Sequence, residues 1–177
     1  MASLKKLWTS TWEVVEVVVI SLVAVFIIRT FIAQPFLVSG ASMEPNFSNG
    51  NYLIVDELTY RFREPERGEV VVFRYPKDPS TYFIKRIIGL PGDKITIRGG
   101  KVTVTTPTGE VIAIPGDTNG VLDLTVSKDQ YFVLGDNRYN SFDSRNWGPV
   151  PKSDLVGIAR LRVFPVNKFE IIEHASF

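Results

Sequence analysis

The chain has 177 residues, 45% hydrophobic and 22% charged, a composition that fits one ordinary folded domain and excludes an intrinsically disordered chain. Its 20 Lys and Arg residues nearly balance its 19 Asp and Glu residues, so the net charge of +1 provides no basic field and nucleic acid is not expected as a partner. Cysteine is absent and the only histidine is His174, which excludes thiol nucleophiles and disulfides. A carboxylate site for Mg²⁺ stays open in principle, but no acidic cluster stands out, and no metal site is expected.

The first predicted element is an apolar segment near the N-terminus, in which residues 17–28 carry no charge. Because a membrane-spanning helix needs about 20 mainly apolar residues, we predict a transmembrane anchor over residues 13–34, after a short cytoplasmic N-terminus of residues 1–12. Lys5 and Lys6 precede the anchor, so the positive-inside rule predicts a single-pass protein of the cell membrane with the rest of the chain outside the cytoplasm. The alternatives are a cleaved signal peptide and a buried strand or helix of a soluble core.

Residues 35–177 are expected to form one extracytoplasmic, mainly β domain. Apolar residues alternate with polar ones there, in short runs bounded by Gly, Pro, Asn or Asp. Paired Gly99 and Gly100 predict a hairpin over residues 94–105, and residues 106–119 are expected to form a surface excursion. The fold class is therefore a compact antiparallel β-sheet or barrel-like domain. Its predicted strands are residues 52–55, 69–74, 82–88, 94–98, 101–105, 111–114, 121–126, 131–134 and 156–164.

Ser42 and Lys85 are the first candidates for chemistry. Ser42 follows Gly40 and Ala41 in a turn, and in a chain without a usable histidine or cysteine its base would have to be a lysine. Lys85 lies in the apolar run YFIKRII, and burial can lower a lysine pKa far enough for the amine to act as a base. The plainer interpretation makes Ser42 a turn residue and Lys85 a solvent-facing strand residue. The pattern alone favours the plainer interpretation.

A third stretch, GDNRYNSFDSRNWG at residues 135–148, carries two Asp, two Arg, three Asn and two Ser residues. Such a composition is typical of a long turn held by Asx hydrogen bonds and Asp–Arg pairs. It could also be a scaffold that presents one hydroxyl to a catalytic lysine. Composition by itself favours the turn.

Taken together, these three stretches resemble bacterial type I signal peptidases, membrane-anchored enzymes with a Ser/Lys dyad that remove signal peptides from exported proteins. The motifs are SGASMEP around Ser42, RGEVVVFRYPKDPSTYFIKRIIGLPGD around Lys85, and VLGDNRYNSFDSRNWGPVP. The resemblance covers nearly the whole chain, with the motifs and the apolar segment in matching order. A lone Gly-x-Ser would be a weak signal, whereas three motifs in this order are specific.

The resemblance implies a role for each matching residue. Ser42 is expected to be the nucleophile that forms an acyl ester, Lys85 the general base, and Ser141 the serine that hydrogen-bonds and orients the lysine. The backbone N–H of Ser42 is expected to act as an oxyanion donor. The residues expected to hold the site together by ion pairs and hydrogen bonds are Asp136, Arg138, Asp143 and Arg145. The resemblance also places Met43 in the substrate groove. Val38, Phe83 and Ile84 are expected to line the groove with it, because an extended substrate could dock beside the strand before Ser42 and the strand that bears Lys85.

Three positions depart from the commonest family pattern. Gly40 lies where some members carry a serine whose hydroxyl completes the oxyanion hole, so the second donor is open. Tyr139 replaces the aspartate usual in GDNRDNS, which removes any ion pair made there. Asn51 replaces a common aspartate, and only a turn adjustment is expected.

The expected function is cleavage of signal peptides from exported preproteins after small-x-small sites such as Ala-x-Ala. The implied partners are these signal peptides, the lipid bilayer and the secretion machinery, and no cofactor is implied. Two alternatives are a self-cleaving Ser/Lys peptidase of the SOS-repressor type and a membrane-tethered β domain that binds a partner without catalysis. The binding domain would be favoured if Lys85 were exposed and far from Ser42.

Overall fold

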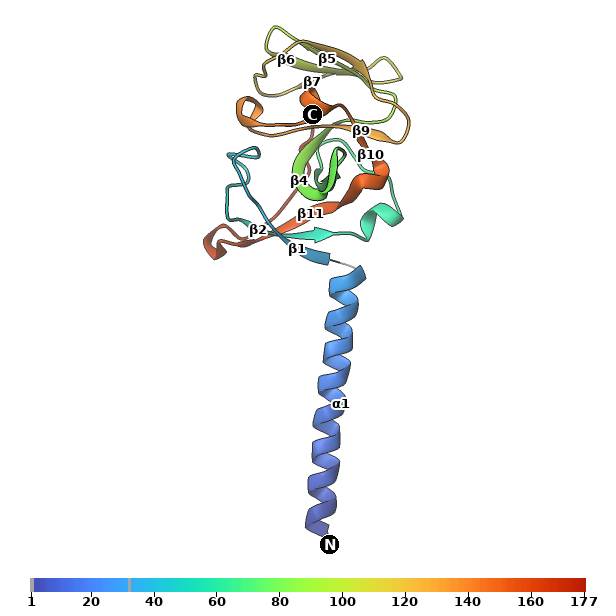
Figure 1. Cartoon of the computed structure of the whole chain (residues 1–177), viewed down its shortest axis with the longest axis vertical. Helices are drawn as coiled ribbons and strands as arrows, with labels where there is room; N and C mark the ends of the chain where they lie inside the picture. The colour runs from blue at the N-terminus through green and yellow to red at the C-terminus, as the bar shows by residue number, and fades with distance from the viewer. Residues whose placement is uncertain (1, 32) are drawn as a thin grey trace.

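The computed structural model describes the backbone of residues 2–31 and 33–177, with side chains for residues 12–26 and 33–177. Figure 1 shows a long N-terminal helix, α1 (Ala2–Phe31), that projects from a β domain. Over these described residues, no helix combines enough length with enough apolar character to cross a membrane. The bounds predicted for the anchor segment change: the helix begins at Ala2, and Ala33 already belongs to a strand.

The larger of two antiparallel sheets carries eight strands in the order β1-β2-β11-β3-β4-β9-β10, with β12 paired to β11. This order has two ends, β1 and β10, so among the described residues the sheet is open and not a closed barrel. The strands are β1 (Ala33–Leu37), β2 (Tyr52–Asp56), β3 (Val70–Tyr75), β4 (Asp78–Gly89), β9 (Gln130–Leu134), β10 (Val150–Pro151), β11 (Leu155–Phe164) and β12 (Glu170–Ile171).

The smaller sheet has the order β7-β6-β5-β8. Its strands are β5 (Lys94–Arg98), β6 (Lys101–Thr105), β7 (Val111–Ile114) and β8 (Leu122–Thr125). The predicted hairpin is confirmed: Arg98 pairs with Lys101, and Gly99 and Gly100 between them adopt positive φ of 56° and 81°. The predicted surface excursion is interrupted by β7, because Val102 and Val104 of β6 pair with that segment.

Short helical turns connect the strands of the larger sheet. They are η1 (Thr59–Arg61), η2 (Arg138–Asn140), α2 (Ser144–Trp147), η3 (Lys152–Asp154) and η4 (Val166–Lys168). Both η2 and α2 fall in the polar stretch that follows β9. That stretch is therefore an ordered connection.

One hydrophobic core joins the two sheets. Ile95 and Ile97 of β5 are fully buried and pack in one cluster with Ile88, Phe132 and Leu134 of the larger sheet. At Gly89, the end of β4, an added Cβ would lie 2.6 Å from the side chain of Ile95. The sheets therefore pack closely at the end of β4, where the chain leaves the larger sheet for β5 of the smaller one.

The mainly β class and all nine predicted strands are confirmed, with bounds that shift by up to four residues. Three strands were not predicted: β1, which lies in the predicted anchor and the Pro35 segment, and the two-residue strands β10 and β12. Strands of two residues, such as β10 and β12, are too short to show an alternation of apolar and polar residues.

Candidate active site

Ser42 lies in the turn that follows β1. The turn is held by Val38, whose N–H donates to the Asn51 carbonyl at 2.9 Å, and by Gly50, whose N–H donates back to the Val38 carbonyl at 2.9 Å. Gly40 adopts a φ of +93°, a conformation that residues with a Cβ rarely take, which explains the glycine two residues before the serine. The backbone N–H of Ser42 donates to no acceptor among the described residues and is available to a ligand.

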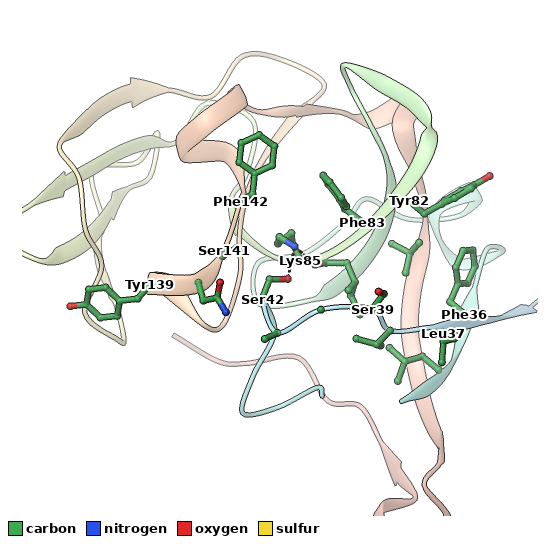
Figure 2. Close-up of a pocket in the computed structure, with 17 residues that line it drawn as sticks. Phe36, Leu37, Ser39, Ser42, Tyr82, Phe83, Lys85, Tyr139, Ser141 and Phe142 are labelled. Carbon is green, nitrogen blue, oxygen red and sulfur yellow. Dashed lines mark hydrogen bonds between the residues drawn. The ribbon is translucent and has the colours of Figure 1, made fainter. Parts of the chain in front are cut away.

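Lys85 reaches Ser42 from β4. In the larger sheet Lys85 pairs with Val71 of β3, so its side chain starts from a central strand, and it is only 4% exposed. Its Nζ lies 2.8 Å from the Ser42 Oγ and donates to the Ile84 carbonyl at 2.9 Å. Figure 2 shows the two side chains meeting at the centre of the cavity. The plainer interpretation, a solvent-facing lysine, is wrong.

Burial lowers the pKa of Lys85 from its ordinary 10.5 to about 8, because desolvation disfavours the ammonium. The carboxylates of Asp143 and Asp136 act in the opposite direction and keep the pKa from falling further. A lysine with a pKa near 8 is partly neutral at neutral pH. It can then accept a proton from a hydroxyl within hydrogen-bond distance.

The stretch at residues 135–148 lies directly against the nucleophile turn. The backbone N–H of Asn137 donates to the Ser42 carbonyl at 3.0 Å, and the Asn137 amide donates to the Ala41 carbonyl at 3.1 Å. A Cβ added at Gly135 would lie 2.4 Å from the Ser42 carbonyl oxygen and 2.2 Å from the Ser141 Oγ. Only glycine lets the two segments approach this closely.

Asp136 forms its ion pair with Arg86, the residue after Lys85. The Arg86 guanidinium donates to both carboxylate oxygens, at 2.8 and 2.7 Å, and also to the Gly68 carbonyl. The Asn46 amide adds a bond of 2.7 Å to the same carboxylate. Arg138, also predicted to hold the site together, makes no ion pair in the described structure and contributes hydrogen bonds instead, to the carbonyls of Gly135 and Gly116.

Asp143 and Arg145 form the predicted pair. Arg145 donates to both oxygens of the fully buried Asp143 carboxylate, at 2.8 and 2.9 Å. Asp143 also caps α2 and accepts from the Gly135 N–H at 3.1 Å. Arg145 continues to the Ser141 carbonyl at 3.3 Å and to Thr118 Oγ1 at 2.8 Å, so the scaffold extends to the loop between β7 and β8.

Ser141 lines the cavity beside Ser42 and Lys85 (Figure 2). Its hydroxyl is buried and has no hydrogen-bond partner among the described residues, so the predicted bond to Lys85 is not made in this structure. The Lys85 amine uses the Ile84 carbonyl instead. An unpartnered buried hydroxyl typically costs about 1–3 kcal/mol, which favours a partner once the site is occupied.

A cavity of about 530 Å³ opens onto Ser42 and Lys85. Val38, Phe83 and Ile84 line it, as predicted, and Leu53 and Val72 add apolar surface. Met43 does not: it is 1% exposed and packs in the core with Phe47 and Leu53, because the chain turns inward after Ser42. The prediction for Met43 as a groove residue is therefore corrected.

The three departures from the family pattern have distinct surroundings. The Gly40 N–H donates to Asn49 Oδ1 at 3.0 Å and is therefore not free to act as a second oxyanion donor. The Asn51 side chain accepts from the Ser48 N–H at 3.1 Å within the turn, and from Arg162. Tyr139 is 69% exposed at the mouth of the cavity and makes no ion pair.

Four residues that contribute to the site were not identified as site residues from the sequence: Arg86, Asn46, Asn137 and Thr118. Arg86 is 50 residues away from Asp136, the group it binds. The others are 90, 96 and 27 residues away from the groups they bind. No local pattern signals such contacts.

Comparison with known proteins identifies relatives along most of the chain. Residues 11–164 match the family model "Signal peptidase, peptidase S26". A probable signal peptidase I-2 of Synechocystis is 40% identical over 172 residues, covering 92% of this chain and 78% of the relative. Signal peptidase I of Leptolyngbya laminosa is 37% identical over 94% of this chain and 86% of its own. Signal peptidase I P of Bacillus subtilis subsp. natto is 36% identical over 92% of both chains.

Proposed function

The chain belongs to the signal peptidase family, peptidase S26, and is a serine endopeptidase of the signal peptidase I type that cleaves signal peptides from exported proteins; we propose that Ser42 and Lys85 are its catalytic dyad. The observation that carries this assignment is the distance of 2.8 Å between the Lys85 Nζ and the Ser42 Oγ, together with the burial of the lysine. A non-catalytic binding domain would need neither feature.

In the first step, the neutral Lys85 amine takes the hydroxyl proton of Ser42 while the Ser42 oxygen attacks the scissile carbonyl. The C–N bond then breaks, the leaving amine receives the proton from the Lys85 ammonium, and an acyl ester on Ser42 remains. Water attacks this ester as Lys85 takes one of its protons. The C–O bond breaks, and the proton returns to the Ser42 oxygen.

The developing oxyanion is stabilised by the free backbone N–H of Ser42. In the occupied site, Ser141 accepts a hydrogen bond from the N–H of neutral Lys85 that is not bound to the Ile84 carbonyl, and this bond aims the lone pair of the amine at Ser42. The unpartnered Ser141 hydroxyl beside the dyad supports this role. The two scaffold pairs, Asp136 with Arg86 and Asp143 with Arg145, keep the loop against the nucleophile turn.

The substrate lies in the cavity as an extended chain. Val38, Leu53, Val72 and Ile84 line the cavity beside the dyad, so its surface there is apolar. In this proposal, apolar pockets between these residues accept small side chains at alternate positions and exclude larger ones. This supports cleavage after small-x-small sites.

Helix α1 attaches the enzyme to the membrane in this proposal. Its large apolar side chains between Trp12 and Phe26 are 50–70% exposed and lie on every side of the helix, which an isolated helix in water does not favour. The predicted orientation, with the N-terminus cytoplasmic and residues 35–177 outside, stays a prediction. Alkaline extraction of membranes from expressing cells tests the attachment: the full chain should stay in the membrane pellet, and release into the supernatant would contradict it.

The dyad is tested with purified full-length protein in detergent and a preprotein with an Ala-x-Ala site. Ser42→Ala and Lys85→Met should each lower the cleavage rate by about 10²- to 10⁴-fold or more, because one removes the nucleophile and the other its base. Matched controls are Ser127→Ala and Lys101→Met, which change exposed residues outside the cavity and should cleave at the wild-type rate. Wild-type cleavage by either dyad variant would remove that residue from the mechanism.

A further inference from the structure

The cavity continues past the dyad in two directions (Figure 2). On one side of Ser42 and Lys85 lie residues of β1 and β4, which we call the strand arm: Phe36, Leu37 and Tyr82. On the other side lie residues of the connection after β9, which we call the loop arm: Tyr139, Ser141 and Phe142. The reaction at Ser42 takes place between the two arms.

The strand arm offers backbone groups. β1 is an end strand of the larger sheet, paired with β2 alone, and β4 pairs with β9 only from Arg86 onward, so residues 78–85 have one unpaired edge in the described structure. Two strand edges on one cavity suit an extended peptide that adds backbone hydrogen bonds. This inference rests on the proposed function, in which the small-x-small residues before the scissile bond bind beside Val38 and Ile84.

The substrate residues after the scissile bond must then lie across the loop arm, because the substrate peptide continues past Ser42 from the strand arm. The loop arm presents two large aromatic side chains there: Phe142 is 52% exposed and Tyr139 is 69% exposed. The exposed part of each ring would be buried only when a ligand covers it. Leu37 and Tyr82 of the strand arm are also exposed, at 56% and 47%, so the loop arm differs from it in lying after the scissile bond and not in exposure.

Phe142 is held in a fixed orientation by other rings. Its centroid lies 4.8 Å from that of Trp147 and 6.0 Å from that of Tyr75, both in edge-on arrangements. Trp147 in turn packs against Phe83, the ring beside Lys85. An exposed ring that is already ordered loses little conformational entropy when it binds a partner.

We propose that Phe142 and Tyr139 bind the first two residues of the mature protein and give the enzyme a preference for aromatic or large apolar side chains directly after the scissile bond. The chemistry is stacking and apolar contact with the ring faces, in addition to selection of small residues before the bond. Tyr139 gives this side of the cavity an uncharged aromatic ring. An aspartate there would offer charge in place of an apolar face.

The test compares two peptides with the same Ala-x-Ala site, one with Phe-Phe and one with Ser-Ser after it. Wild-type enzyme should cleave the Phe-Phe peptide with a kcat/KM about 2- to 12-fold higher, the range expected of one aromatic contact. Phe142→Ala and Tyr139→Asp should each reduce this ratio, and the double variant should bring it near one. Phe142→Leu, which keeps an apolar side chain of similar size, should give an intermediate ratio.

Phe62→Ala is the matched control, because Phe62 is an 81% exposed aromatic residue outside the cavity. It should keep the wild-type ratio. A second measurement, the preference for Ala over Leu immediately before the bond, should be the same in the loop-arm variants and the wild type. A wild-type ratio of one, or a ratio unchanged in the double variant, overturns the inference while the proposed function stands. Failure of wild-type enzyme to cleave either peptide overturns both.

Discussion

The two sheets of this protein differ in what they bury. The strands of the larger sheet bury charged side chains, among them Lys85, Arg86 and Arg162. The strands of the smaller sheet bury only apolar side chains, such as Ile95, Ile97 and Val104. A buried charge needs partners and still opposes folding. The comparison therefore indicates that the smaller sheet stabilises the fold, whereas the larger sheet is less stabilising because it buries the charged groups of the active site.

Polar contacts join the two sheets in addition to the shared core. Thr118, in the loop between β7 and β8, is 2% exposed and accepts a hydrogen bond from Arg145 at 2.8 Å. Arg145 also donates to the Ser141 carbonyl. The smaller sheet therefore supports the catalytic loop although its strands supply no residue of the dyad.

The largest expected effect on stability comes from a substitution in the core of the smaller sheet. Ile97→Ala should lower the free energy of unfolding by about 2–5 kcal/mol, because the residue is fully buried and its loss leaves a cavity. Denaturant unfolding measures this change. The kcat/KM of the remaining folded enzyme should stay near wild type, and a large loss of activity in fully folded protein would contradict the division between the sheets.

Removal of the buried amine should have the opposite effect on stability. Lys85 has a pKa of about 8 in the folded protein and its ordinary 10.5 in the unfolded chain, so burial of the ammonium opposes folding fully below pH 8. This penalty fades as pH rises from 8 to 10.5. Lys85→Met should therefore stabilise the inactive protein at pH 7, by up to about 3 kcal/mol.

Chemical denaturation at pH 7 and at pH 10.5 separates this cause from packing. The gain in the free energy of unfolding of Lys85→Met over wild type should be clearly smaller at pH 10.5. Lys101→Met, at an exposed lysine, controls for charge alone. An equal gain at both pH values would argue against desolvation of the ammonium as its cause.

A smaller effect is expected where the sheets touch. Thr118→Val removes the hydroxyl that accepts from Arg145, and the loss of one hydrogen bond should lower the free energy of unfolding by about 1 kcal/mol. It should also lower kcat several-fold by loosening the loop that carries Ser141. Thr125→Val, at an exposed threonine of β8, should leave both quantities at their wild-type values. Equal behaviour of the two variants would show that Thr118 does not support the site.

The smallest expected effect is a shift in pH dependence. The kcat/KM of the wild type should rise with pH through a pKa of about 8, because Lys85 must be neutral to accept the proton. The negative charge of Asp136 raises the pKa of Lys85, so Asp136→Asn should move this acidic limb to lower pH. Asp123→Asn, at a carboxylate of the smaller sheet, should leave it in place. A shift to higher pH in Asp136→Asn would contradict the assignment of the limb to Lys85.

Several features of the site followed from the residues alone. The absence of cysteine and the position of the single histidine restricted the base of Ser42 to a lysine, and the apolar run around Lys85 made this lysine a candidate. The pattern alone nevertheless favoured a strand with a solvent-facing lysine. Alternation places side chains on faces, but it does not say what covers each face.

The sequence by itself determined the mainly β class, nine strands, the hairpin over residues 94–105 and the motifs of the family, because alternation, turn residues and motifs are local properties. Tertiary structure alone decided that Asp136 pairs with Arg86, that Asn137 holds the Ser42 turn and that Met43 packs in the core. It also decided that Ser141 has no partner and that Tyr139 and Phe142 flank the cavity. These outcomes depend on which distant segments meet in space, which no local pattern specifies.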